Sequence, residues 1–292
     1  MERAARVALS GVSGLGPARF RRLLEEFGSA EAALEARPAE MQARAVLTTS
    51  LIEELVGLPA RLEEVQAELA ALDKQGVRAL TWEDADYPQL LLPTSSAPPV
   101  LWWSGEVGPN DGPGVAVVGS REVSDEALAW AREAAAGLAE AGVVVISGLA
   151  AGVDAAAHEG ALSVGGPTVG VCGCGILTAL TRGTGGLAGQ VAEGGALCSE
   201  LSPAAPLLPQ ALHARDRITA GLASAVIVVE ARAEGGAVHT AKCALREGRP
   251  VFAVDSQDRR RAPGNAQLLA EGARPLITPQ DALAVVRGSS HV

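Results

Sequence analysis

Glycines, hydroxyl groups and cations gather directly after two apolar runs in the middle of the chain. Gly119-Ser120-Arg121 follows Val115–Val118, and Ser147-Gly148 ends the run that begins at Val143. Glycine lets a ligand approach the backbone, a hydroxyl group donates a hydrogen bond, and a guanidinium group grips phosphate oxygens with two parallel N–H donors. This combination predicts a phosphate-binding site. The alternative is that Arg121 pairs with a carboxylate at a neighbouring strand end, either Glu200 or Glu230.

Further cations occupy two later helical segments. Arg215 and Arg217 flank Asp216, and Lys242 lies two residues beyond Thr240. Several cations in a row suit several phosphates, whereas a single nucleotide needs fewer. Thr240 either binds a phosphate or caps its helix, and Asp216 lowers the local positive charge and orients the flanking arginines.

Asp154 and His158 lie four residues apart, so they face the same side of a predicted helix. Such a pair invites an acid–base interpretation. An aspartate near a helix start is also ordinary capping chemistry, and the sequence offers no evident nucleophile or third partner. A structural or positioning role is therefore favoured, and no catalytic residue is expected.

The four cysteines are too few for a disulfide scaffold, and Cys172 and Cys174 have the wrong spacing for a C-x-x-C pair. We expect all four to be reduced and mainly structural, and no metal site is expected in the chain.

The elements that position these residues follow from hydrophobic patterns. Val115–Gly119 and Val143–Ser147 have the composition of strands buried on both faces, and the segment between them, 125–141, has helical periodicity. Two parallel strands joined by a helix end at the same edge of a sheet, where open α/β sheets bind ligands. The two glycine turns should therefore lie side by side. Further strands are predicted at 167–172, 196–200, 225–230, 249–254 and 274–277. Helices are predicted at 183–194, 213–222 and 278–286, with another through Thr240, Lys242 and Leu245 after a break at Gly235-Gly236, and a frayed tail from 288. The alternation predicts a doubly wound, mainly parallel α/β sheet of extended Rossmann-like form.

The dinucleotide fingerprint G-x-G-x-x-G is missing from the start of the first helix, and no acidic residue ends the second strand. This argues against a nicotinamide enzyme, and no cofactor is expected.

The first part of the chain is rich in helix formers. The string Val12–Arg19, with Pro17 suited to a first helical turn, is typical of a helix-hairpin-helix turn, whose backbone N–H groups can hold a DNA phosphate. The alternative is a helix connection without a ligand. We expect a small helical (helix-hairpin-helix, SAM-like) domain at 1–80 and an α/β domain at 81–292. Trp102 and Trp103 either stack on bases or anchor an extra strand at 100–103, and the second interpretation is favoured.

The net charge of −10 argues against broad, non-specific adhesion to nucleic acid but does not exclude a local basic patch. No apolar run indicates a transmembrane helix, and the start lacks the long apolar core of a signal peptide. We expect a cytoplasmic protein.

Taken together, these residues resemble the DNA processing protein A (DprA/Smf) family over residues 95–275. The matching strings are VAVVGSR (115–121), SGLAAGVDAAAHEGAL (147–162), CSE (198–200), RDRITAGLASAVIVVEA (215–231), GGAVHTAKCALREGRPVFAV (235–254) and GNAQLLAEGA (264–273). The order and spacing of the strings make the combination specific, although no single string would be.

The resemblance implies an extended Rossmann fold and a homodimer that binds single-stranded DNA without enzymatic activity. It implies a role in natural transformation, in which the protein protects incoming strands and loads the RecA recombinase. The implied DNA phosphate-binding residues are Gly119, Ser120, Arg121, Ser147, Gly148, Arg215, Arg217, Thr240 and Lys242. Many relatives carry a C-terminal winged helix, and this chain is expected to have none.

The sequence departs from the family at several positions. The family usually shows Phe-Pro-Lys before Arg-Asn-Arg, whereas this chain has Leu212-His213-Ala214 before Arg215-Asp216-Arg217. A usual Tyr-Pro is replaced near Leu180-Thr181, and a usual Pro-Gly is Asp255-Ser256. These changes predict weaker DNA affinity, or a shift to other cations such as Arg182 or Arg259–Arg261.

Two other functions compete with this one. A nucleotide-handling enzyme of the phosphoribohydrolase type would need a positioned carboxylate, and Glu200, Glu230 and Asp154 are the candidates. A nucleotide-sensing or protein-interaction module would make no DNA contact.

Overall fold

The computed structural model describes residues 1–45, 47–182, 186–255 and 260–287. Its first part is a cluster of short helices around a core that includes Leu9, Phe20, Met41 and Leu55. Ser29 and Thr48 cap α3 and α5 through their hydroxyl groups. The helices are α1 (Glu2–Ser10), α2 (Pro17–Phe27), α3 (Ala30–Glu35), α4 (Pro38–Ala45), α5 (Thr49–Val56), η1 (Pro59–Arg61) and α6 (Leu62–Asp73).

The second part is built on a nine-stranded sheet with the order β1-β2-β6-β5-β4-β3-β7-β8-β9. β2 is antiparallel to both neighbours, and the strands from β6 to β9 are parallel. The strands are β1 (Val77–Thr81), β2 (Val100–Gly105), β3 (Gly114–Val118), β4 (Val144–Ser147), β5 (Thr168–Val171), β6 (Ala196–Ser199), β7 (Ala225–Val228), β8 (Val251–Val254) and β9 (Arg274–Leu276).

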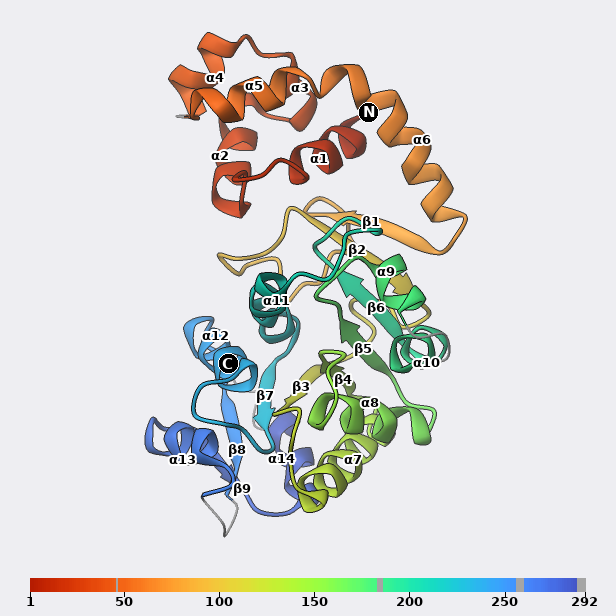
Figure 1. Cartoon of the computed structure of the whole chain (residues 1–292), viewed down its shortest axis with the longest axis vertical. Coiled ribbons are helices and arrows are strands. Elements are labelled where there is room, and N and C mark those ends of the chain that lie inside the picture. Colours follow the sequence, from red (N-terminus) through yellow and green to blue (C-terminus); the bar gives the residue numbers. More distant parts are fainter. Residues whose placement is uncertain (46, 183–185, 256–259, 288–292) are drawn as a thin grey trace.

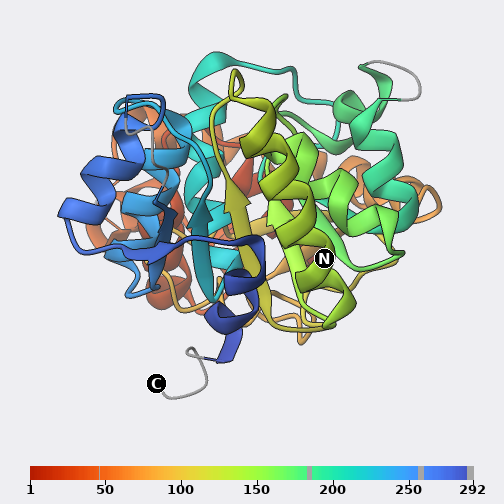
Figure 2. The same cartoon turned by 90° about the horizontal axis from the view of Figure 1, so that it is seen from below.

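Helices cover both faces of the sheet (Figures 1 and 2). Val115 and Val117 of β3 pack in the core that includes α7 (Asp125–Glu140) and α8 (Val153–Ser163). The alternate residues Ala116 and Val118 pack in the core that includes α11 (Pro209–Leu222) and α12 (Gly236–Arg246). Both faces of the strand are thus buried, which explains its continuous apolar run. The remaining helices are α9 (Ile176–Thr181), α10 (Leu187–Gly194), α13 (Pro263–Ala270), η2 (Pro279–Asp281) and α14 (Ala282–Arg287).

The predicted fold class is confirmed: a helical N-terminal part precedes a Rossmann-like, mainly parallel sheet. Sequence patterns missed β1, α9 and α13, and placed the start of α11 at His213 instead of Pro209. The predicted closing helix is a 3₁₀ turn followed by α14. Gly183, Ser256, Arg259 and the tail from 288 lie outside the described residues. No described helix has the length and apolar character needed to cross a membrane.

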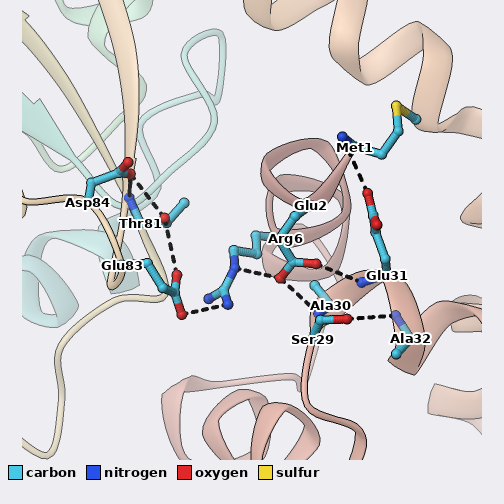
Figure 3. A network of polar contacts seen from close by, with 10 residues as sticks. All are labelled: Met1, Glu2, Arg6, Ser29, Ala30, Glu31, Ala32, Thr81, Glu83 and Asp84. Atoms are coloured by element: carbon cyan, nitrogen blue, oxygen red, sulfur yellow. Dashed lines mark hydrogen bonds and ion pairs between the residues drawn. The ribbon is translucent and has the colours of Figure 1, made fainter.

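Arg6 joins the helical part to the sheet (Figure 3). Its side chain is 6% exposed, with Nε 2.8 Å from Glu2 Oε1 and Nη2 2.5 Å from Glu83 Oε1. Glu2 also accepts hydrogen bonds from the backbone N–H groups of Ala30 and Glu31. Burial pushes the pKa of Glu2 up, but these N–H groups and Arg6 bring it below its ordinary value. Arg6 therefore ties α1 to the turn after β1, and Glu2 ties α1 to the start of α3. The predicted division of the chain into domains at 1–80 and 81–292 stays a proposal.

Replacing this arginine should destabilise the protein measurably. We expect Arg6→Ala to lower the free energy of unfolding by about 2 kcal/mol, because it removes hydrogen bonds to charged groups from a buried side chain. Urea denaturation followed by circular dichroism measures the loss. Arg37→Ala removes an exposed ion pair with Glu40 and is the control, for which little change is expected. Equal effects of the two substitutions would contradict this role for Arg6.

Candidate functional site

The order of the strands creates a crevice between β3 and β7. From β3 the chain proceeds through β4 and β5 to β6 on one side, and then crosses back through α11 to β7 on the other. The carboxyl ends of such neighbouring strands form the usual ligand crevice of open α/β sheets. A hollow of about 570 Å³ lies there. Its lining includes the turn after β3, the turn after β7, and the first turns of α11 and α12.

The turn after β3 is held by backbone contacts. Ser120 N donates to Glu230 O at 2.8 Å, and Val153 N donates to Ser120 O at 3.3 Å. The Ser120 hydroxyl group accepts a hydrogen bond from Arg232 N at 3.1 Å, so it fixes the turn after β7 as well. A Cβ on Gly119 would lie 2.4 Å from a methyl group of Val153, which explains the glycine. The turn leaves the exposed Arg121 at the rim of the hollow.

Arg215 is buried in the wall of the hollow between two carboxylates. Its Nη2 lies 3.9 Å from Asp154 Oδ2, and its Nε lies 3.6 Å from Asp216 Oδ1. Burial raises the pKa of both carboxyl groups, while the charge of Arg215 lowers it. Gly148 makes room for this arginine, because a Cβ there would lie 1.9 Å from its Nη1.

The structure brings together part of the predicted phosphate-binding set. The hollow is lined by Gly119, Ser120, Arg121, Arg215 and Thr240, and Gly148 lies against Arg215. The buried Ser147 hydroxyl group instead donates to Val117 O at 2.7 Å. Arg217 forms an ion pair with Glu200, and Lys242 is exposed on α12 outside the hollow. The buried Thr240 donates back to Gly236 O at 2.9 Å.

Arg121 makes no ion pair with any residue that the structure describes. The alternative partners are engaged elsewhere: Glu200 pairs with Arg217, and Glu230 accepts two hydrogen bonds from Ser124, the N-cap of α7. The nearby Arg232 is paired with Glu122. Arg121 is therefore available to bind an anion, and the structure does not show the alternative pairing with Glu200 or Glu230.

Arg121 also borders two further hollows. One, of about 750 Å³, lies beside α7 and α8, and the other, of about 440 Å³, has largely apolar walls that include Leu149, Val171 and Leu207. The second hollow contains the exposed Arg182, a cation that sequence reasoning named only as a substitute. The start of α12 at Gly235-Gly236 was missed as part of the site. No side chain caps this end of the helix, so its first backbone N–H groups have no side-chain acceptor. Because these residues line the hollow, their N–H groups are available to an anion there.

His158 is a structural residue. It is completely buried, with Nδ1 2.7 Å from Thr168 Oγ1 and Nε2 2.7 Å from Gly148 O. Burial lowers its pKa to about 4, so the imidazole is neutral and holds the Gly148 carbonyl group in place. Asp154 faces Arg215 instead. These contacts support the predicted positioning role rather than acid–base chemistry.

The cysteines and the two tryptophans of β2 are buried in the protein interior. All four cysteines are buried and free, and burial raises the pKa of their thiol groups. Trp102 and Trp103 are 4% and 1% exposed within the sheet, so neither ring is available for stacking on a base.

Comparisons with known proteins agree with this architecture. Residues 78–287 match the family model of DNA recombination-mediator protein A, and residues 1–71 match the model of the DprA-like N-terminal HHH domain. Protein Smf of Synechocystis sp. is 35% identical over 288 residues, which cover 97% of this chain and 72% of that protein. DNA processing protein DprA of Streptococcus pneumoniae is 36% identical over 202 residues, which cover 69% and 71% of the two chains.

Two solved structures are similar to the whole chain or most of it. The X-ray structure of DprA from Streptococcus pneumoniae has a TM-score of 0.72 at 31% identity and covers 96% of this chain and 97% of that one. DNA processing protein A from Helicobacter pylori has a TM-score of 0.64 at 25% identity, with coverage of 74% and 97%. The Helicobacter pylori structure is described as giving insight into a unique single-stranded DNA binding mode of that protein.

The buried His158 predicts a pH dependence of stability. Its folded pKa of about 4 lies below the ordinary histidine value of 6.5, so the unfolded chain takes up a proton first as the pH falls. The stabilisation is complete above the unfolded pKa and is lost as the pH falls from there towards 4. We expect this residue to remove about 2 kcal/mol of stability between about pH 7 and about pH 5.

Urea denaturation of the wild type and His158→Gln at both pH values measures this contribution. Asp154 and Asp216 titrate in both proteins, so the difference between the two pH dependences isolates His158. The same pH dependence in both proteins would show that the imidazole is not held neutral.

Proposed function

The chain belongs to the DNA recombination-mediator protein A family, and from this premise we propose that it binds single-stranded DNA through phosphates at the crevice between β3 and β7. The observation that carries the proposal is Arg121. Its guanidinium group has no ion-pair partner among the described residues, and it borders three adjoining hollows. A strand that passes this point would have room on either side of a single phosphate contact.

The groups around Arg121 are suited to a phosphate. Arg215 offers a guanidinium group in the wall, and the uncapped start of α12 offers backbone N–H donors. Arg215 is already flanked by Asp154 and Asp216, whose charges offset its own. It therefore contributes positioned N–H donors to a phosphate more than it contributes electrostatic attraction. Arg121 and Arg182 therefore supply most of the attraction for the strand, despite a net charge of −10 for the whole chain.

The neighbouring hollow favours a single strand over a duplex. Its walls include Leu149, Val171 and Leu207 beside Arg182 and Arg121, a combination of apolar surface and cations. An unpaired base can leave the strand and enter such a space, whereas the bases of a duplex are held inside the helix. Because the cations bind the backbone, little preference for sequence is expected.

We further propose that the protein is not an enzyme. The carboxylates that a phosphoribohydrolase would need have other roles: Glu230 binds Ser124, the N-cap of α7, Glu200 pairs with Arg217, and Asp154 is buried against Arg215. In the family's role, the protein would act as a cytoplasmic homodimer that protects incoming DNA during natural transformation and loads the RecA recombinase. A second proposal is that the backbone N–H groups of the turn at Val12–Arg19 hold a DNA phosphate.

The DNA proposal predicts a dominant effect of Arg121. Arg121→Ala should weaken binding to a labelled oligothymidine at least about 10-fold and reduce the steepness of the salt dependence by about 0.7 in log–log slope, because one phosphate contact is lost. Fluorescence anisotropy at two salt concentrations measures both quantities. The wild type should bind the single strand more tightly than a duplex of the same length.

Two arginine variants make this test specific. Arg274 begins β9 at the opposite edge of the sheet, so Arg274→Ala removes the same charge far from the crevice and should leave binding unchanged. Arg217→Ala should have a smaller effect than Arg121→Ala, because Glu200 already neutralises Arg217. Unchanged affinity of Arg121→Ala, or equal losses in all three variants, would exclude the crevice as the DNA site.

RecA loading predicts a separate result. The wild type should accelerate RecA filament formation on single strands coated with a single-stranded DNA-binding protein, and Arg121→Ala should lose this effect in proportion to its DNA affinity. RecA-dependent ATP hydrolysis follows filament formation. Absence of acceleration by a wild-type protein that binds DNA would contradict the loading role and leave DNA binding in place.

A further inference from the structure

Two histidines and one aspartate meet between α11 and α12. His213 and Asp216 lie one turn apart on α11, and His239 extends from α12. One nitrogen of each imidazole and one carboxylate oxygen all lie within 4.8 Å of one another. Asp216 is buried, His239 is half-buried and His213 is exposed, so the cluster is accessible to solvent on the side of His213.

The distances in the cluster fit a tetrahedral metal ion. His239 Nδ1 lies 3.2 Å from Asp216 Oδ2, and His213 Nδ1 lies 3.8 Å from the same oxygen. Ligand atoms at zinc bond lengths of about 2.0–2.1 Å are separated by about 3.3 Å in a tetrahedron. The pair formed by Asp216 and His239 already has this spacing. The His213 side chain is 70% exposed, so only a small rotation of a surface side chain is needed to complete the set.

Asp216 and His239 each have a neighbour for their other polar atom. Asp216 Oδ1 lies 3.6 Å from Arg215 Nε, and His239 Nε2 lies 3.9 Å from Cys243 Sγ. Such outer contacts fix the orientation of metal ligands. They leave Oδ2 of the carboxylate and Nδ1 of the imidazole directed at the same point.

We propose that His213, Asp216 and His239 form a binding site for a zinc-type divalent ion. Two imidazole nitrogens and one carboxylate oxygen suit Zn²⁺, Co²⁺, Ni²⁺ or Cu²⁺, whereas Mg²⁺ and Ca²⁺ prefer oxygen ligands alone. Three protein ligands leave one tetrahedral position for water or another ligand. The cluster is independent of the residues that carry the DNA proposal, since Arg121 is not part of it.

The position of the site gives the ion a second consequence, which rests on the proposed function. His213 and Asp216 both line the hollow that contains Arg121 and Arg215. An ion held there places a positive charge in the wall and offers its open position to a phosphate oxygen. The metal would then strengthen binding of the strand.

Cobalt is a direct probe of the site. Untagged full-length protein, first treated with a chelator, should bind one Co²⁺ per chain with visible d–d absorption bands that Zn²⁺ abolishes and Mg²⁺ does not. His213→Ala and His239→Ala should each weaken Co²⁺ binding at least about 10-fold. Gln210→Ala changes an exposed residue one turn earlier on α11 and should bind Co²⁺ like the wild type. Circular dichroism shows that the variants are folded.

Absence of Co²⁺ binding, or binding that survives both histidine substitutions, overturns the metal site. The phosphate step is tested by anisotropy of a labelled oligothymidine with and without Zn²⁺. Zn²⁺ should tighten binding to the wild type several-fold and leave His213→Ala unchanged. No tightening in a protein that binds Co²⁺ overturns the phosphate step alone. If the oligonucleotide does not bind under any condition, the DNA proposal fails and the cobalt result still decides the metal site.

Discussion

The backbone at Gly152 passes so close to the turn after β3 that no side chain fits between them. A Cβ at Gly152 would lie 2.4 Å from Ser120 O and 2.5 Å from Arg121 O, and its φ of +84° is one that glycine adopts easily. This crossing fixes the start of α8 against the end of β3, and the bond from Ser120 N to Glu230 O fixes the end of β7 to the same turn. The part of the wall formed by this turn is therefore held by backbone contacts. Only long side chains at the rim, Arg121 above all, can adapt to a ligand.

Charge in the crevice is divided between fixed and free arginines. Arg215 is buried between Asp154 and Asp216, and removing either carboxylate would leave a buried charge with less compensation. These two contacts hold the arginine in place without a ligand. Arg121 and Arg182 are exposed, and no carboxylate among the described residues neutralises them. The fixed arginine therefore shapes the wall, and in the proposed function the two exposed arginines would attract the strand despite the net charge of −10.

The sequence predicted the parallel strands, because buried strands such as Val115–Val118 have an unbroken apolar pattern, and it therefore predicted which turns share the carboxyl edge of the sheet. It did not predict which way each side chain points at that edge. Ser147 and Lys242 both occupy promising places in the sequence, yet Ser147 bonds to the neighbouring strand and Lys242 lies outside the hollow. β1 was missed because its residues, VRALT, mix polar and apolar types and pair in antiparallel fashion with β2. Strand direction and helix rotation depend on long-range packing, which no short pattern contains.

Asp216 links the two kinds of site. The sequence comparison with the family indicated an asparagine at this position, and the aspartate was expected to orient the flanking arginines. One of its oxygens does face Arg215, while the other faces His239 and His213. An amide has only one accepting oxygen and would direct its NH₂ group at one of these cationic or N–H-bearing neighbours. A carboxylate satisfies both sides at once. The aspartate and the two histidines are therefore best understood as one unit, in which the same side chain holds an arginine for anions and completes a ligand set for a cation.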